Sequence, residues 1–337
     1  MLRIATYNLE NLDEDRFNDN GELIRPGFAE RAPVLRAALE RLRADIICLQ
    51  EVHGQETEGE PRQLLTLQQL VAPTRYADYK TVSTMLKDGS EVYDKRNLVV
   101  LVRPDIEVID QRQINGEVVG HPHYKRQIAG DETPKPQTWE RPLQHVTLRL
   151  PTGQTLHVLN AHFKSKLAVR HGPSMEDRFT WKSAAAWAEG FFVSSLKRVG
   201  AALEARAVVD QIFDNDADAA VILAGDFNAL PDEVPVMALR GRVEETGNAD
   251  LTNRVLLPLE NNIPEDKRFT LIHHGKGEMI DHILGSRRMV ECFMHSEVHN
   301  EGLQDESIAF ATDRKFPASD HAPMVVQFDD HLMPPVG

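Results

Sequence analysis

The sequence predicts an α+β fold: a mixed or mostly antiparallel β-sheet core with helices packed outside. Short apolar runs of Ile, Val and Leu recur along the 337 residues, and such runs are typical of buried strands. Three predicted helical segments separate some of these runs. The predicted strands far outnumber the helices that could connect parallel neighbours, which disfavours a purely parallel sheet.

The elements begin with a strand over residues 4–10. Residues 28–42 carry Leu and Ala at helical spacing opposite charged side chains, which predicts an amphipathic helix that leads into a strand over 45–51. Residues 62–70 predict a second helix, and residues 97–102 predict another strand.

The second half follows a similar pattern. Residues 111–141 hold Gly, Pro and charge with little periodicity, which predicts a long surface excursion. Residues 143–150 and 156–159 predict a hairpin across the turn Pro151-Thr-Gly153. A strongly helical segment over 183–213 then leads to a strand that begins at Val221.

Composition limits the class of protein. The chain has no repeats, low-complexity tracts or flexible linker, and its site-like motifs reach both ends, so we expect one domain over residues 1–330 and a tail over 331–337. A net charge of −14 argues against holding nucleic acid by bulk charge, although not against a nuclease that turns its substrate over.

Neither a signal-like N-terminus nor an apolar run long enough to span a membrane is evident, so a cytoplasmic location is expected. Cys48 lies in an apolar run and is expected to be a small buried residue.

Polar side chains gather at the ends of the predicted strands. Those that follow a strand are Asn8, Glu51, His162 and Asp226, and those that precede the last strand, at 323–328, are Asp320 and His321. If the last strand runs antiparallel to the others, all of these groups meet at one edge of the sheets. Such a collection of oxygen and imidazole groups suits a hard divalent cation and acid–base chemistry on a phosphate.

The carboxylate of Glu51 needs a partner because burying an unpaired charge is costly. The partner could be a metal ion, an arginine or water. Strand alternation would put Asn8 and Glu10 on the same side, where Asn8 could support the metal or the phosphate and Glu10 could be a second ligand. Mg²⁺ typically accepts one or two carboxylates together with water and phosphate oxygens.

The segment Gly225-Asp226-Phe227-Asn228 is the sharpest local motif. Asp226 could orient or deprotonate a water molecule, while the amide of Asn228 could donate to a phosphoryl oxygen. The alternative is an Asx-turn at the end of a strand, which is common for these residues.

Two histidines are candidates for the chemistry. His321 is expected to pair with a distant acid such as Asp281, because its neighbour Asp320 would point to the opposite face of a strand. A lone histidine in a strand is usually structural, but His162 lies in a segment that suggests a local positive pocket. That segment also contains Asn160, Lys164 and Lys166.

Six motifs in this order resemble the endonuclease/exonuclease/phosphatase superfamily, and the similarity covers nearly the whole chain. The motifs are Tyr7-Asn-Leu-Glu-Asn-Leu12, Leu49-Gln-Glu51, Asn160-Ala-His-Phe-Lys-Ser-Lys166, Gly225-Asp-Phe-Asn228, Ile280-Asp-His-Ile-Leu284 and Ser319-Asp-His321. The first and third look most like those of bacterial predicted nucleases. The resemblance implies a four-layer α/β/β/α sandwich of two packed mixed sheets flanked by helices, like that of deoxyribonuclease I.

The resemblance also implies a divalent cation, Mg²⁺ or Mn²⁺, and a role for each site residue. Glu51 would be the principal metal ligand, with Asn8, Glu10 and Asp320 as further ligands. Asp226 would position or activate the attacking water, and Asn228 would contact the phosphate. His321, oriented by Asp281 or Asp320, would act as a base or stabilise the transition state. His162 occupies a position that holds histidine in deoxyribonuclease-like and sphingomyelinase-like members, and Asn160 and Lys164 would contact the substrate.

The substrate implied first is DNA, cut as an endo- or exonuclease. A phospholipid headgroup, a sugar phosphate or another small phosphoester is the alternative, which the acidic net charge mildly favours. No aromatic-tipped segment that would bind a membrane is evident in the sequence. An inactive binding protein on this fold is the alternative of another class, and no obligate protein partner is implied. His282 replaces a tyrosine common in relatives, and the segments 111–141 and 241–278 match no subfamily.

Overall fold

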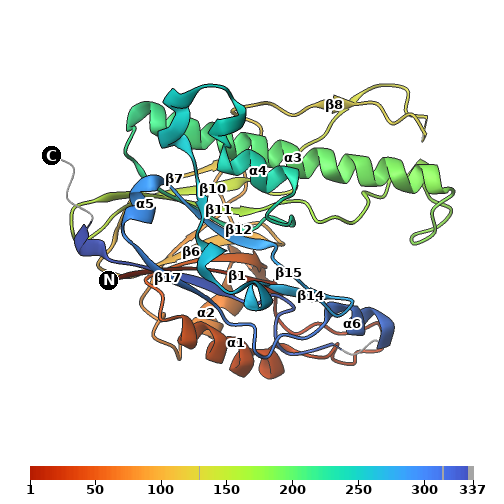
Figure 1. Cartoon of the computed structure of the whole chain (residues 1–337). Coiled ribbons are helices and arrows are strands. Elements are labelled where there is room, and N and C mark those ends of the chain that lie inside the picture. The colour runs from red at the N-terminus through yellow and green to blue at the C-terminus, as the bar shows by residue number, and fades with distance from the viewer. Residues whose placement is uncertain (129, 313–314, 333–337) are drawn as a thin grey trace.

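The computed structural model describes residues 1–128, 130–312 and 315–332. Two six-stranded sheets pack face to face, and helices cover both outer faces (Figure 1). The predicted α+β sandwich of four layers is therefore confirmed. Of the predicted tail at 331–337, the residues from 333 onward lie outside the described part of the chain.

The first sheet contains both ends of the described chain. Its order is β17-β18-β1-β2-β6-β5, where β17 is Phe293–Val298, β18 Met324–Phe328, β1 Leu2–Leu12, β2 Ile46–Val52, β6 Asn97–Val102 and β5 Lys80–Ser83. Only the pair of β1 and β2 is parallel among these neighbours. The last strand, β18, runs antiparallel to β1, which is the direction that brings Asp320 and His321 to the end of β1.

The second sheet supplies the other half of the polar edge. Its order is β13-β16-β12-β11-β10-β7, where β13 is Leu257–Pro258, β16 Asp281–Gly285, β12 Ala220–Asp226, β11 Thr155–His162, β10 Leu143–Arg149 and β7 Glu107–Ile114. The pair of β11 and β12 is parallel, and the other pairs are antiparallel. Both sheets are therefore mixed, as predicted.

The helices and small elements cover this core. The helices are α1 Phe28–Leu42, α2 Leu65–Val71, α3 Ala184–Asn215, α4 Val234–Arg240, α5 Arg287–Glu291 and α6 Glu306–Thr312. Three small hairpins pair β3 Gln55–Thr57 with β4 Glu60–Gln63, β8 His123–Tyr124 with β9 Lys135–Pro136, and β14 Leu271–His273 with β15 Lys276–Glu278. Single 3-10 turns span Gly172–Ser174, Val243–Glu245, Ala249–Arg254, Leu259–Asn262, Glu265–Lys267 and Asp330–Leu332. No described helix has the length and apolar character that a membrane crossing requires.

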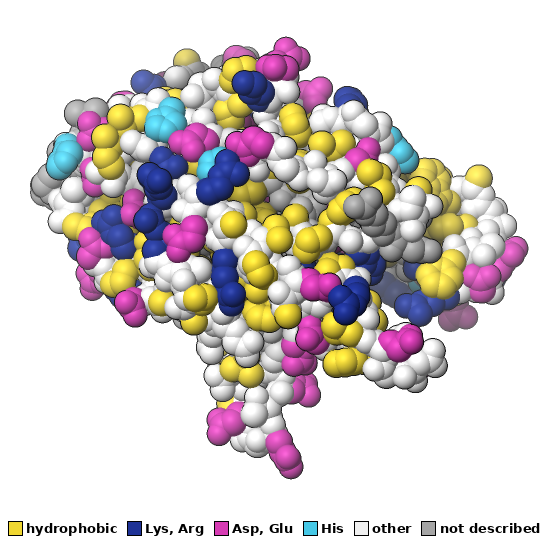
Figure 2. Space-filling model, turned by 90° about the horizontal axis from the view of Figure 1, so that it is seen from below, with side chains coloured by type: hydrophobic (Ala, Val, Ile, Leu, Met, Phe, Trp, Pro, Cys, Tyr) yellow, Lys and Arg dark blue, Asp and Glu magenta, His cyan; other side chains and the backbone are white. Residues whose placement is uncertain are grey.

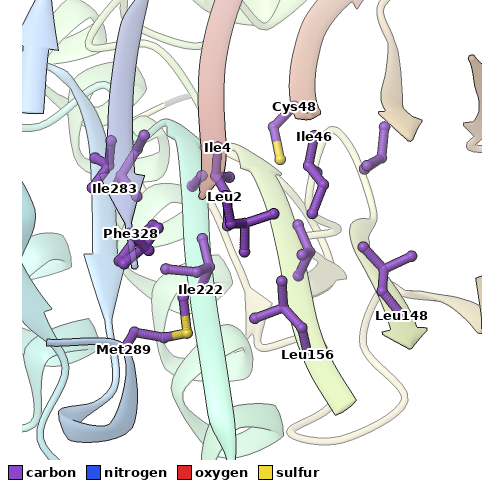
Figure 3. Packing of buried hydrophobic residues seen from close by; sticks show 14 of the residues in the cluster. Leu2, Ile4, Ile46, Cys48, Leu148, Leu156, Ile222, Ile283, Met289 and Phe328 are labelled. Atoms are coloured by element: carbon purple, nitrogen blue, oxygen red, sulfur yellow. The ribbon is translucent and has the colours of Figure 1, made fainter. Parts of the chain in front are cut away.

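Strand alternation divides the core into layers. Along β1, Leu2 and Ile4 point into the layer between the sheets (Figure 3). Ala5 and Tyr7, on the other face of the strand, pack against α1 and α2. A third apolar layer joins the second sheet to α3 and α4. Cys48 is fully buried between the sheets, as expected. Each fully buried Leu or Ile contributes about 1.5–3 kcal/mol, so the sandwich is a rigid support for the strand ends.

The lower surface of the sandwich, on the side of α1 and α2, carries charges of both signs. Lys and Arg side chains lie among Asp and Glu side chains there, with apolar atoms between them (Figure 2). Mixed charge of this kind is typical of a solvated outer face. A binding site is therefore better sought at the strand ends.

Two predicted boundaries were wrong. The helix expected over 62–70 begins only at Leu65, because Arg62 belongs to β4, where its guanidinium bonds to Glu91 at 2.8 Å. The surface excursion expected over 111–141 starts late, because residues 111–114 complete β7. This strand lies at the edge of its sheet and most of its side chains are exposed, so it lacks the apolar pattern by which strands are recognised.

The buried ring of His145 in β10 gives the fold a pH dependence. Burial, with the nearby His157 and Arg112, lowers the pKa of His145 to about 3. The unfolded chain takes up this proton near pH 6.5, so the stability that neutral His145 contributes is present above pH 6.5 and is lost as the pH falls toward 3. We expect the free energy of unfolding to decrease by up to about 1.4 kcal/mol per pH unit in this window.

Urea unfolding at several pH values between 7 and 4 measures this slope. His145→Gln should flatten it, whereas the same change at the exposed His123 should leave it as in the wild type. Equal slopes in His145→Gln and the wild type would show that His145 does not titrate in this way.

Candidate active site

The ends of five strands meet at one edge of the sandwich. β1 and β2 of the first sheet bring Asn8 and Glu51 there, and β11, β12 and β16 of the second bring His162, Asp226 and Asp281. Asp226 and Asp281 are direct cross-strand partners, and His162 is the register partner of Asp226 on its other side. The predicted meeting of these strand ends is present in the structure.

Asp226 lies at the centre of this group and is 1% exposed. Its Oδ2 accepts a hydrogen bond from Asn8 Nδ2 at 3.0 Å, and its Oδ1 accepts one from the backbone N–H of Asn228 at 2.9 Å. Burial, opposed by the charge of His321 and reinforced by that of Asp281, raises the pKa of Asp226. A carboxylate that is fixed in position and has a raised pKa is suited to accept a proton from water.

Gly225 is required at this point by close packing within the sheet. A Cβ added to Gly225 would lie 1.9 Å from the carbonyl oxygen of Ala161 in the neighbouring strand β11. The glycine therefore permits close approach of β11 and β12 within the sheet. The chain turns only after the strand, at Asn228, whose φ is +49°.

His321 pairs with Asp281, as the sequence analysis predicted. Its Nδ1 lies 2.8 Å from Asp281 Oδ2, which leaves Nε2 directed at the carboxylates of Asp226 and Asp320, each 3.9 Å away. Burial alone would lower the pKa of His321, but the carboxylates around it, Asp281 first, raise it well above the usual range. His321 is therefore a charged ring that can donate a hydrogen bond or a proton through Nε2.

His162 has the opposite character. Its Nε2 lies 3.2 Å from Asp226 Oδ2 and 3.7 Å from Glu51 Oε1, and the side chain is 3% exposed. Burial, with the nearby charges of Arg141 and His321, lowers the pKa of His162 well below its usual range. The pKa values of the two imidazoles are thus shifted in opposite directions, an arrangement that separates acid from base roles.

Backbone irregularities orient the side chains of Glu10 and Glu51 in the first sheet. The register of β2 shifts between Leu49 and Val52, and that of β1 shifts between Asn8 and Leu12. Within these bulges Glu51 has a φ of +60° and Glu10 a φ of +48°. Bulges re-aim side chains next to active sites. Because Glu10 is not extended, the predicted alternation of Asn8 and Glu10 does not apply.

Two arginines that were not predicted from the sequence face Glu51. Glu51 Oε1 lies 3.7 Å from Arg96 Nε and 3.9 Å from Arg141 Nη2, while Oε2 accepts a bond from the backbone N–H of Asn11 at 3.0 Å. The Arg141 side chain is 8% exposed, and its buried Nη1 has no hydrogen-bond partner among the described residues. These guanidinium groups give an acidic protein a local anion-binding capacity.

The oxygen set predicted to hold a metal fits a hard cation in two respects. Oδ1 of Asp320 is buried and accepts no hydrogen bond from the described residues. Burial, and then the Asp320 carboxylate, raises the pKa of Glu10, and burial raises that of Asp320 as well. A divalent cation at these oxygens would offset the cost of desolvating them. Among the described residues, three ligand-type atoms within 4.8 Å of one another occur instead in a different group, formed by Asp226, Asp281 and His321.

Three further predicted residues lie at different places. Asn160 is 0% exposed, and its amide donates to Leu49 O and Val99 O between the sheets, so it does not reach the open edge and the predicted substrate contact was wrong. Lys164 lies at the rim, where its ammonium bonds to Ser165 and lies 3.7 Å from Glu140. Asn228 is partly buried and donates to Phe163 O at 3.2 Å.

Solved structures with the same fold cover the whole architecture. A truncated TDP2 from Caenorhabditis elegans matches with a TM-score of 0.55 and 16% identity over 97% of each chain. A mannosyl-6-phosphatase from Bacteroides thetaiotaomicron matches with a TM-score of 0.56 and 16% identity over 98% of this chain and all of that one. The 3′ phosphatase NExo from Neisseria, bound to a product DNA hairpin, matches with a TM-score of 0.53 and 17% identity over 98% of this chain and all of that one.

Sequence comparison defines the family. No curated protein matches the chain significantly. The model of the endonuclease/exonuclease/phosphatase family, however, matches residues 5–321, which spans every site residue described above. The chain belongs to the endonuclease/exonuclease/phosphatase family.

Proposed function

We propose that the protein is a Mg²⁺- or Mn²⁺-dependent phosphodiesterase that cuts DNA by in-line attack of water, with no covalent intermediate. The observation that carries the proposal is the buried carboxylate of Asp226, whose Oδ2 lies 3.2 Å from His162 Nε2 and 3.9 Å from His321 Nε2. Among the solved structures above, the 3′ phosphatase is bound to a product DNA hairpin, which supports DNA as the substrate class.

Different residues would activate the water, donate to the phosphoryl group and bind the phosphate. Asp226, held by Asn8 and Asn228, would orient the water and accept its proton. His321, held by Asp281, would donate to a phosphoryl oxygen through Nε2. Arg96 and Arg141 would attract the phosphate.

Glu51, Glu10, Asp320 and Asn8 would hold the cation, as the family resemblance implies. The chemistry that such a cation supplies when bound is polarisation of the phosphoryl oxygen and stabilisation of the leaving oxygen. We assign the group of Asp226, Asp281 and His321 to acid–base catalysis and not to metal binding, because Asp281 and His321 already bond to each other.

Hydrolysis of plasmid DNA and of bis-p-nitrophenyl phosphate with Mg²⁺ or Mn²⁺ tests the proposal. We expect both substrates to be cut and Glu51→Ala to lose at least about 100-fold in rate, because metal-dependent charge stabilisation supplies several kcal/mol. Glu58→Ala, the same change at an exposed residue, is the matched control. Cleavage of the small diester alone would make a small phosphoester or lipid headgroup the better substrate, and cleavage of neither would favour an inactive binding protein.

A further inference from the structure

A cavity lies on the rim of the active site, beyond the end of β11. Its volume is about 430 Å³, within the range of about 300–1,000 Å³ typical of small-ligand sites. We call it the rim pocket. Its lining includes Glu140, Lys164, Leu167, Arg170, Trp181 and Trp187. Lys164 follows His162 by two residues and Glu140 precedes Arg141, so a ligand here would adjoin the group bound at the catalytic residues.

The two indole rings of the rim pocket are fixed by their surroundings. Trp181 closes a bridge with Met175 and packs against the backbone of α3, where a Cβ at Gly190 would lie 2.7 Å from the ring. Trp187 lies in the first turns of α3 and is 47% exposed. It stacks on Phe191 with ring centres 5.4 Å apart and planes 16° from parallel. Two flat apolar faces are therefore held in place and open to a ligand.

Positive charge surrounds these rings. Residues 164–182 carry five Lys or Arg side chains and two acidic ones, in a chain whose net charge is −14. The guanidinium groups of Arg170 and Arg178 lie 5.4 and 5.2 Å from the ring centre of Phe179. Exposed aromatic rings among cations are how proteins hold single-stranded nucleic acid, with bases stacked on rings and phosphates near the charges.

We propose that the rim pocket holds an unpaired nucleobase of the strand whose phosphate lies at the catalytic residues. This inference rests on the proposed function and names single-stranded or frayed DNA as its substrate. Stacking on Trp187 requires an exposed base face, which a base within a duplex does not offer. A membrane surface would contact exposed side chains such as Leu167 and Phe179, and membrane binding is one of the outcomes that the test below distinguishes.

Tryptophan fluorescence gives a direct readout of binding. Two of the three tryptophans line the rim pocket, and the third, Trp139, is 4% exposed. In full-length protein carrying Asp226→Asn to prevent cleavage, a short single-stranded oligonucleotide should quench the emission. Adding Trp187→Ala should weaken binding about 5- to 150-fold, the range of stacking per base. Trp187→Phe should keep most of the affinity, whereas Trp187→Leu, which is apolar but has no π-face, should not.

Abasic substitutions locate the base. In strands with one abasic position each, a single position should weaken binding to the Asp226→Asn protein, and that position should have no effect once Trp187→Ala is present. The inference would be overturned if proteins with Trp187 and with Trp187→Ala bound every strand with equal affinity. It would also be overturned if the protein bound phosphatidylglycerol vesicles and Trp187→Leu preserved that binding. DNA cleavage by the wild type in either case leaves the proposed function intact. Conversely, if DNA binding depended on Trp187 but the wild type did not cleave DNA, the inference about the rim pocket would stand and the proposed nuclease activity would be refuted.

Discussion

Asp226→Asn should reduce the turnover number on DNA by about 10²–10⁴-fold, the range that a positioned general base contributes. The substitution keeps the size of the side chain and removes its ability to accept a proton. The substrate should still bind, because Arg96 and Arg141 are untouched. The change should therefore appear in kcat more than in KM.

The same variant should fold at least as stably as the wild type. Burial raises the pKa of Asp226, so the folded state holds this carboxylate in its charged form at a cost when the pH lies well above the usual value. Asparagine removes that cost. Thermal unfolding beside steady-state kinetics separates the two effects, and inactivity with an unchanged or higher Tm is expected.

A matched control lies at the other end of the same strand. Asp218 is exposed just before β12, and Asp218→Asn should change neither rate nor Tm. A rate for Asp226→Asn within a few-fold of the wild type would remove Asp226 from the reaction. A similar loss in Asp218→Asn would mean that the assay reports folding rather than chemistry.

The sandwich and much of the site edge follow from local patterns. Apolar runs identify strands, and a polar side chain directly after such a run lies at a sheet edge, so the amino-acid sequence alone places Asp226 and His162 there. The direction of the last strand then predicted where His321 would lie, and its distance from Asp281 agrees. These steps need only strand periodicity and chain direction.

The depth of a side chain within the sandwich and the positions of β-bulges could not be predicted from strand periodicity and chain direction. Asn160 and His162 share a strand face, yet Asn160 lies one pleat deeper and its amide is used between the sheets. The positive φ of Glu51 arises from the register shift of β2, which no residue preference announces. Arg96 and Arg141 precede antiparallel strands β6 and β10, so the rule that placed His321, applied to every strand start, would have found them.

The pair of His282 and Glu260 beneath the site should dominate the response of stability to mutation. Both side chains are 0% exposed, and His282 Nδ1 lies 2.7 Å from Glu260 Oε1. His282 Nε2 lies 2.8 Å from the carbonyl oxygen of Ala229. The Ala229 carbonyl only accepts a hydrogen bond, and so does Glu260 when it is ionised; both ring nitrogens then donate, and the ring is an imidazolium. Burial lowers the pKa of His282, but the bond and charge of Glu260 raise it above its usual value.

Glu260→Ala should reduce the free energy of unfolding by about 3–5 kcal/mol, because it leaves a buried cation without its partner. Glu260→Gln keeps an acceptor and should cost less. Glu265→Ala, the same change at an exposed residue of the next turn, should be close to neutral. Urea unfolding followed by circular dichroism measures all three.

Two further results distinguish an ion pair from simple packing. The stability that protonated His282 contributes is fully present below pH 6.5 and is lost as the pH rises through its raised folded pKa, so the deficit of Glu260→Ala should narrow in alkaline buffer. Replacing both partners by apolar residues, with Glu260→Leu and His282→Phe, should recover stability relative to Glu260→Ala, because it removes both buried charges and keeps a ring against Phe227. A deficit that is independent of pH and additive in the double variant would instead assign the loss to a cavity. His282 follows Asp281 in β16, and Ala229 follows Asn228 in the loop after Asp226, so the protonated ring links these two segments. In that case the ion pair would not be what holds them together.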